Sequence, residues 1–171
     1  MTCTIRLYDA ADAAGLFEAA RESVAEVHPW LPWCRPGYTL AEAEEWARTR
    51  GALAAQGEEY HFVIAGEDGR FLGACGINQI NRMHRFANLG YWLRTSATGR
   101  GLATQAVRLA ADFAFRETDL VRLEIVCAVG NARSQRVAER AGAVREGVLR
   151  RRLVLHETPA DAVLYSLVRP D

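Results

Sequence analysis

Residues 91–116, YWLRTSATGRGLATQAVRLAADFAFR, begin with an apolar strand end, pass through a turn with two glycines and continue into a long amphipathic segment. From Leu102 onward, apolar residues recur every three to four positions, which predicts a helix. A helix start carries backbone N–H groups without an intrahelical acceptor and partial positive charge, so it favours an anion. Gly99 and Gly101 would let the backbone approach a bulky diphosphate. Residues 98–103 therefore predict a pyrophosphate cradle, although such a glycine pair alone is more often a tight turn.

The overall composition narrows the possible functions. A chain of 171 residues is long enough for one domain, and we expect a single domain over residues 1–171. Acidic and basic residues balance at 21 each, so no global charge would attract nucleic acid or an anionic membrane. All 21 basic residues are arginine. The absence of lysine excludes Walker-type phosphate loops, protein kinases and Schiff-base enzymes.

The cysteines and histidines show no metal-binding spacing. There is no Cys-x-x-Cys pair, so the four cysteines predict reduced, mostly buried thiols, and we expect no metal. The N-terminus lacks the pattern of a signal peptide, and no uncharged apolar run is long enough to cross a bilayer. These observations predict a cytoplasmic protein without a membrane partner.

The remaining elements follow from periodicity and turn residues. Strand 86–93, the helix from Leu102 and strand 122–128 form a unit that implies parallel strands joined by a right-handed crossover. Asn131 is placed to cap a short helix, and Pro159 is expected in the connection between the last two strands. The predicted elements are strand 4–8, helix 16–27, helix 39–57, strands 60–65, 71–77 and 86–93, helix 102–116, strand 122–128, helix 132–141 and strands 144–155 and 162–168.

A loop rich in proline and tryptophan separates the first two helices. Residues 28–37 contain three prolines, which forbid a regular helix, and the large apolar side chains of Trp30 and Trp33. Both indoles could fill the core, they could form the wall of an acceptor pocket, or they could do both. The sequence does not separate these two interpretations.

With this order of elements, the chain resembles the GCN5-related N-acetyltransferase (GNAT) superfamily, and within it the RimJ/RimL type that acetylates the N-termini of ribosomal proteins. The resemblance covers nearly the whole chain. It implies an α+β fold with three α/β/α layers, about four helices and a mixed, mostly antiparallel sheet of about seven strands that splays in the middle. The segments that carry it are Trp30-Leu31-Pro32-Trp33, Gly90-Tyr91-Trp92-Leu93, Gly99-Arg100-Gly101-Leu102-Ala103-Thr104, Asn131-Ala132-Arg133-Ser134 and Arg145-Glu146-Gly147 with Leu149-Arg150.

The resemblance implies acetyl-coenzyme A as co-substrate, bound in a V-shaped gap between the strand that ends at Leu93 and strand 122–128. Backbone groups of the glycine loop would hold the pyrophosphate, and unpaired strand groups would bond the pantetheine arm. An asparagine at position 131 is also explained by helix capping alone. The residues expected to contact the cofactor are Trp92, Leu93, Thr98, Gly99, Arg100, Gly101, Leu102, Ala103, Thr104, Asn131 and Ser134.

The catalytic groups depart from the family pattern at one position. Relatives often carry a glutamate where this chain has Asn88, and an amide cannot act as a base. We expect direct transfer in a ternary complex, with Asn88 orienting the amine and Ser134 protonating the leaving sulfur. Tyr91 is the competing acid. Glu124 is a reserve base, although pairing with an arginine explains it better, and Cys127 is expected to be an inert buried thiol.

The acceptor is expected to be a primary amine, with a protein N-terminus favoured. An α-amine titrates near pH 8, so roughly a tenth is neutral at pH 7 and a strong base is hardly needed. A small amine, such as an amino acid, polyamine or antibiotic, is the alternative acceptor, and a non-catalytic coenzyme-A-binding protein is an alternative of another class.

Several further residues are candidates for contact with a partner. Trp30, Trp33, His84 and Arg85 are the candidate acceptor contacts. The arginines of the closing strands more simply face solvent. A homodimer could form through these same strands.

Overall fold

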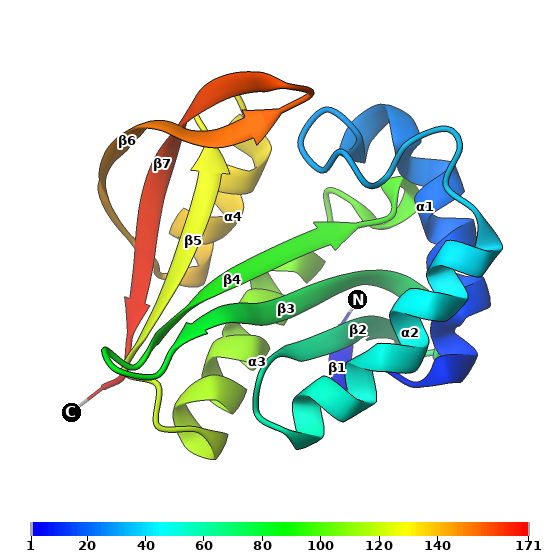
Figure 1. Ribbon diagram of the computed structural model, residues 1–171, viewed down its shortest axis with the longest axis horizontal. Coiled ribbons are helices and arrows are strands. Elements are labelled where there is room, and N and C mark those ends of the chain that lie inside the picture. The colour runs from blue at the N-terminus through cyan, green and yellow to red at the C-terminus, as the bar shows by residue number, and fades with distance from the viewer. Residues whose placement is uncertain (1, 171) are drawn as a thin grey trace.

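The computed structural model describes residues 2–170 and shows a seven-stranded sheet with helices on both faces (Figure 1). The sheet order is β1-β2-β3-β4-β5-β7-β6, and β4 and β5 form its parallel pair. The elements are β1 (Cys3–Leu7), η1 (Ala10–Asp12), α1 (Ala13–Val27), α2 (Leu40–Ala55), β2 (Tyr60–Gly66), β3 (Phe71–Asn81), β4 (Phe86–Leu93), η2 (Thr95–Ala97), α3 (Leu102–Glu117), β5 (Arg122–Ala128), α4 (Ala132–Ala141), β6 (Val144–Leu155) and β7 (Thr158–Val168).

The predicted fold class and order of elements are confirmed, but several bounds differ. Strand β3, predicted to end at residue 77, runs to Asn81, and α1 begins at Ala13 instead of Leu16. The first strand spans Cys3–Leu7, one residue earlier than predicted. The last strand begins at Thr158, so the prediction that Pro159 lies in the connection is wrong. Pro159 pairs with Val154 of β6, whereas β7 pairs with β5 only from Ala162 onward. A proline is tolerated in a strand where no second neighbour needs its N–H group.

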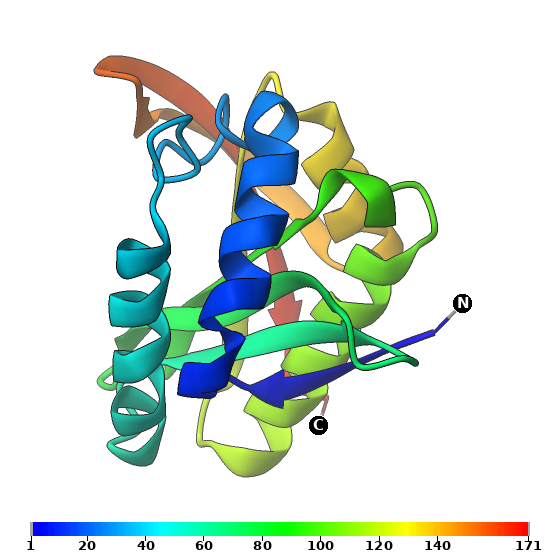
Figure 2. The same cartoon turned by 90° about the vertical axis from the view of Figure 1, so that its right-hand side faces the viewer.

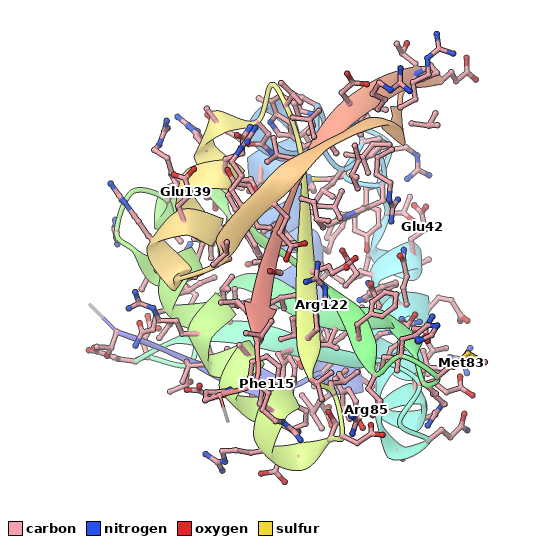
Figure 3. All side chains as sticks on the ribbon, turned by 90° about the vertical axis from the view of Figure 1, so that its left-hand side faces the viewer. Glu42, Met83, Arg85, Phe115, Arg122 and Glu139 are labelled. Carbon is pink, nitrogen blue, oxygen red and sulfur yellow. The ribbon has the colours of Figure 1, made fainter. Side chains whose placement is uncertain are left out.

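Two hydrophobic clusters hold the layers together. The larger one packs α3 and α4 against one face of the sheet, and Phe113 of α3 meets the rings of Tyr60 and Phe62 on β2. The smaller one packs α1 and α2 against the opposite face of β2 and β3. Figure 2 shows α1 and α2 on one side of the sheet and α3 on the other. The helices leave part of β5, β6 and β7 uncovered on the α1 side (Figure 3).

The two parallel strands stay together for only a few residues. Pairing between β4 and β5 covers Phe86–Asn88 and Arg122–Glu124 and then ends. The strands diverge beyond that point, as Figure 1 shows. The resulting V opens toward the starts of α3 and α4, because both helices follow directly after its two arms.

Candidate active site

Among residues 2–170, the edge of β4 that faces the V has no strand partner along its second half. Residues 89–93 pair with β3 on one side, while pairing with β5 ends at Asn88. Backbone N–H and C=O groups need hydrogen-bond partners when they are removed from water. This edge therefore fits an extended ligand that carries amide groups, which is the chemistry of a pantetheine arm.

The glycine turn after β4 has the conformation that the sequence predicts. Gly99 and Gly101 adopt φ values of 77° and 78°, in the left-handed region that favours glycine. Gly101 is the N-cap of α3 and makes no side-chain capping bond, and the first turn of α3 contains no acidic residue. The amides at this helix start thus have no carboxylate acceptor nearby, and they fit a diphosphate.

The predicted cofactor residues of this turn differ in what their side chains can offer. Thr98 donates its hydroxyl to the carbonyl oxygen of Thr95 at 2.8 Å, so that proton is already used. Leu102 is 1% exposed and its side chain belongs to the core, which leaves only its backbone for a ligand. Arg100 is exposed, and Ala103 and Thr104 are half-buried.

A buried charged residue that the sequence analysis missed, Arg94, holds in place the segment that leads into the glycine turn. Arg94 directly follows β4 and is only 5% exposed. Its Nε donates to Glu22 of α1 at 2.8 Å, and its Nη1 donates to the carbonyl oxygen of Phe71 at 3.1 Å. Glu22 also accepts the Ser96 N–H at 2.7 Å, and Arg94 holds the pKa of Glu22 down at about 2. These bonds fix α1 to the segment that leads into the glycine turn.

Ser134, Tyr91 and Cys127 meet on the α3 and α4 side of the V. The Ser134 hydroxyl donates to the Tyr91 oxygen at 3.0 Å and lies 3.2 Å from the Cys127 sulfur. Tyr91 in turn donates to the backbone carbonyl of Ser134 at 2.8 Å. Burial raises the pKa of both Tyr91 and Cys127, so both groups stay protonated at neutral pH. The cluster can relay a proton but offers no base.

Asn131 has the capping role that its position predicts. Its Oδ1 accepts the Ser134 N–H at 3.1 Å at the start of α4. This bond holds Ser134 in the first turn of the helix, at the mouth of the V. The predicted contact of Asn131 with the cofactor stays a prediction. The side-chain amide nitrogen is the group left for it, because the backbone N–H donates to Ala128 and the carbonyl accepts from Gln135.

Asn88 and Trp92 lie on the other face of β4. Ala87 and Leu89 are buried toward α3, and side chains alternate along a strand, so Asn88 and Trp92 face the α1 side. Asn88 donates its amide N–H to the Asn78 side-chain oxygen at 2.9 Å. The Ser134 cluster and Asn88 thus lie on opposite faces of the sheet, and the transfer reaction would use groups from both faces.

The loop between α1 and α2 contacts β4, the turn after β5 and the tip of the β6–β7 hairpin. The Trp33 ring lies 5.3 Å from the Trp92 ring on β4, between ring centroids. Trp30 lies against the turn after β5, because a Cβ atom at Gly130 would come within 3.3 Å of its indole. Trp30 is half-buried and Trp33 is 37% exposed, and neither belongs to a core cluster. This geometry favours the pocket-wall interpretation of the two tryptophans.

The third contact of this loop is with the tip of the hairpin formed by β6 and β7. His156 at this tip bonds the backbone oxygen of His28 through Nε2 at 3.0 Å, and the two imidazole rings lie 4.5 Å apart. The contact joins residues that are 128 positions apart in the chain. Nothing in the sequence pattern around either histidine indicates it.

His84 and Arg85 lie at the end of the V where β4 and β5 are still paired. They lie in the turn between β3 and β4, at the end of β4 opposite to the glycine turn. Figure 3 shows Arg85 and Met83 in the lower half of the molecule, away from the upper end of the β6–β7 hairpin. Their predicted contact with an acceptor stays a prediction.

Comparison with known proteins agrees with this geometry. The family model described as "Acetyltransferase (GNAT) domain" matches residues 3–144. The chain belongs to the GNAT acetyltransferase family. As a GNAT N-acetyltransferase it is an acyltransferase that acts on amines. YdaF of Bacillus subtilis, named as a candidate ribosomal N-acetyltransferase, is 32% identical over 97% of this chain and 91% of its own. The ribosomal-protein-serine acetyltransferase of Escherichia coli is 32% identical over 81% of this chain and 76% of its own.

Solved structures of GNAT enzymes show the same fold. RimJ of Mycobacterium smegmatis, in complex with a coenzyme A disulfide, has a TM-score of 0.88 and 27% identity over 96% of this chain and 80% of its own. RimL, a ribosomal α-N-protein acetyltransferase in complex with coenzyme A, has a TM-score of 0.90 and 23% identity over 99% of this chain and 95% of its own. Within residues 2–170, no helix is long and apolar enough to span a membrane. The same residues contain no group of histidine, cysteine and acidic side chains that could hold a metal ion.

Proposed function

We propose that this GNAT enzyme transfers the acetyl group of acetyl-coenzyme A to the N-terminal α-amine of a protein. The observation that carries the donor part is the pairing between β4 and β5, which ends at Asn88 and leaves one strand edge open beside a glycine turn. Acetyl-coenzyme A supplies an activated thioester there. Amides of residues 99–103 would hold its diphosphate, and the open edge of residues 89–93 would hold its amide-bearing arm.

The acceptor part rests on the chemistry of the α1 face and on the relatives. Relatives of similar length act on ribosomal proteins, and one is named for a serine acceptor. Asn88 can orient an amine but cannot deprotonate it, which suits an α-amine that is already partly neutral at pH 7. The tryptophans of the α1–α2 loop would cover the residues that follow this amine.

In the proposed reaction, the residues on the two faces divide the work. Asn88 orients the amine nitrogen beside the acetyl carbonyl on the α1 face. A backbone N–H next to Leu93 stabilises the charge that develops on the carbonyl oxygen. Ser134, whose hydroxyl is held by Tyr91, delivers a proton to the departing sulfur from the opposite face. Transfer is direct, without an acetylated enzyme.

Two further parts of the proposal concern the setting of the enzyme. We expect it to work in the cytoplasm, where acetyl-coenzyme A and new protein N-termini are both present. A homodimer through β6 stays a prediction, and it is favoured by the position of β6 at the end of the sheet order.

The proposal is tested by supplying the purified protein with acetyl-coenzyme A and a matched peptide panel. We expect thiol release and acetylation at the N-terminus of peptides that begin with serine or alanine, and none with blocked N-termini. The same peptides with an internal lysine and a blocked N-terminus control for side-chain transfer. Release only with amino acids or polyamines would instead support a small-amine enzyme. Tight coenzyme binding with no release across the panel would support a binding protein.

A further inference from the structure

Three polar side chains lie side by side where the V begins. Asn78 on β3 is the register partner of Asn88 on β4, and Asn88 is the partner of Glu124 on β5. Direct partners in a sheet point to the same face, so all three side chains face the α1 side. This is the last paired position before β4 and β5 diverge. The row therefore forms the floor of the gap on the face where the amine would arrive.

The Asn78 side chain fixes the orientation of the Asn88 amide. Asn78 accepts the Asn88 Nδ2–H at 2.9 Å, so the amide oxygen of Asn88 is turned away from Asn78. Within residues 2–170 this oxygen has no hydrogen-bond partner. It is available to accept an N–H from an acceptor amine.

Glu124 keeps one carboxylate oxygen available, because Arg122 makes one hydrogen bond to Glu124 and two to Glu146. Arg122 gives Glu124 a single bond, from Nε to Oε1 at 2.9 Å. Both terminal nitrogens of Arg122 go to the two oxygens of Glu146, at 2.7 and 2.5 Å. Glu146 thus takes the fork of the guanidinium, which is its stronger binding mode. The second oxygen of Glu124 has no partner within residues 2–170, and its side chain is 24% exposed.

The surroundings of Glu124 connect it to solvent. Figure 3 shows Arg122 on the face of the sheet that the helices leave uncovered. The groups that face the Glu124 carboxylate are Arg122 on its own strand and the register partners Asn88 on β4 and Ser166 on β7. Ser166 donates its hydroxyl to Glu146 at 2.6 Å, which keeps Glu146 on Arg122. A proton taken up by Glu124 can leave through this open face.

We infer that Glu124 is the base that takes the proton of the acceptor amine, while Asn88, oriented by Asn78, holds the amine nitrogen. The inference rests on the proposed function and assigns the carboxylate that position 88 lacks to the neighbouring strand, at the same level of the sheet. Glu124 is then a catalytic residue and Asn78 a positioning residue.

The proton balance of the step is complete. The ammonium group of the acceptor loses one proton to Glu124, and the freed lone pair forms the N–C bond to the acetyl carbonyl carbon. The C–S bond breaks and its electron pair stays on sulfur. The nitrogen loses a second proton to solvent. The sulfur takes one proton from Ser134, which regains it from solvent, so these transfers cancel. Glu124 releases its proton to solvent, so one acetylated amine, one thiol and one proton are formed.

The test is the pH dependence of E124Q with an α-amine peptide. Glutamine keeps an oxygen for the Arg122 bond, so the fold and the affinity for coenzyme A should not change. At pH 7 we expect kcat/KM for the peptide to fall about tenfold, because about a tenth of an α-amine is already neutral. Near pH 9 the amine deprotonates by itself, and the variant should approach the unchanged enzyme. E45Q, on the exposed surface of α2, is the matched control and should match the unchanged enzyme at both pH values.

Two outcomes would overturn the assignment of Glu124. One is a rate for E124Q equal to that of the unchanged enzyme at pH 7, and the other is a loss that stays constant from pH 7 to pH 9. Either result leaves the proposed function intact as long as the unchanged enzyme acetylates the peptide. An inactive unchanged enzyme would instead refute the proposed function.

Asn78 is tested with the pair N78A and N78D. N78A removes the oxygen that holds the Asn88 amide, and we expect kcat/KM for the amine to fall about tenfold with unchanged affinity for coenzyme A. N78D keeps an oxygen acceptor at the same place and should restore most of this loss. Equal activity of N78A and the unchanged enzyme would remove Asn78 from the proposal.

Discussion

The Ser134 hydroxyl donates to the Tyr91 oxygen at 3.0 Å, and Tyr91 donates to the Ser134 backbone carbonyl at 2.8 Å. The Tyr91 proton is thus bonded to a backbone oxygen. The Ser134 proton is bonded to a side-chain oxygen, and the hydroxyl can turn from this oxygen to a thiolate. This geometry favours Ser134 over Tyr91 as the proposed donor of a proton to the departing sulfur.

We predict that S134A lowers kcat about a hundredfold, the lower end of the usual contribution of a general acid. The KM for acetyl-coenzyme A should change less than about twofold, since the cofactor is held by backbone groups of the V. Steady-state kinetics with a peptide acceptor measure both constants. C127A is the control, because it removes the other neighbour of the hydroxyl without removing the donor. A larger loss of kcat in Y91F than in S134A would exchange the two roles.

The pair formed by Glu22 and Arg94 predicts a variant that affects the cofactor side of the reaction. E22Q leaves the guanidinium of Arg94, 5% exposed, without its counter-charge, which we expect to destabilise the fold by about 3 kcal/mol. The Ser96 N–H also loses its carboxylate acceptor, so the segment before the glycine turn is held less firmly. We expect the KM for acetyl-coenzyme A to rise several-fold more than the KM for the amine.

Thermal unfolding and steady-state kinetics measure the two effects of E22Q. E18Q, one turn earlier on the exposed side of α1, is the matched control and should change neither quantity. Equal increases in both KM values would mean that the ion pair supports the whole fold and not the turn in particular.

Acid should destabilise the protein in a defined range of pH. Hydrogen bonds from Arg94 and Arg122 hold the pKa of Glu22 and Glu146 at about 2, below the ordinary value of 4.5. As the pH falls below about 4.5, the unfolded chain binds these protons first, so stability present above that pH is lost progressively down to about pH 2.

Urea unfolding between pH 7 and pH 3 measures this loss. In E22Q the unfolding free energy should fall less steeply below pH 4.5 than in the unchanged protein, because one of the two linked carboxylates is gone. An identical slope in both proteins would show that Glu22 does not contribute to the acid sensitivity.

Two glycine substitutions should have opposite effects. Gly101 has a φ of 78°, where an alanine costs about 1–2 kcal/mol and would shift the start of α3. G101A should therefore weaken coenzyme A binding in calorimetry. Gly51 lies inside α2 with open space around its Cβ position, so G51A should stabilise the protein by about 0.5–1 kcal/mol without affecting binding. Unchanged coenzyme affinity in G101A would contradict a role of this turn in holding the diphosphate.

The acceptor contacts predicted for the turn at His84 and Arg85 stay a prediction, and β4 shows how far this turn lies from each part of the site. The turn directly precedes β4, and the chain alone suggested that it is close to the site. A strand advances about 3.3 Å per residue, so the eight residues of β4 place the turn about 25 Å from the far end of the strand. The turn is therefore far from the glycine turn that would hold the diphosphate, but Arg85 is only three positions before Asn88, which would orient the amine.

The sequence by itself determined the order of the elements, the glycine turn at the start of α3 and the Asn131 cap of α4. These features depend on residues a few positions apart, since helix periodicity, strand alternation, capping and positive φ are local properties. For the same reason β6 and α4 have the bounds that the pattern predicts, Val144–Leu155 and Ala132–Ala141.

Only the tertiary structure decided which side chains meet across the V. Glu22 and Arg94 are 72 positions apart in the chain, and His28 and His156 are 128 positions apart. The oxygen of Glu124 that remains available depends on how Arg122 divides its bonds with Glu146 on another strand. Such contacts are set by sheet order and register, which arise from packing the whole chain around one core, and no local pattern encodes them.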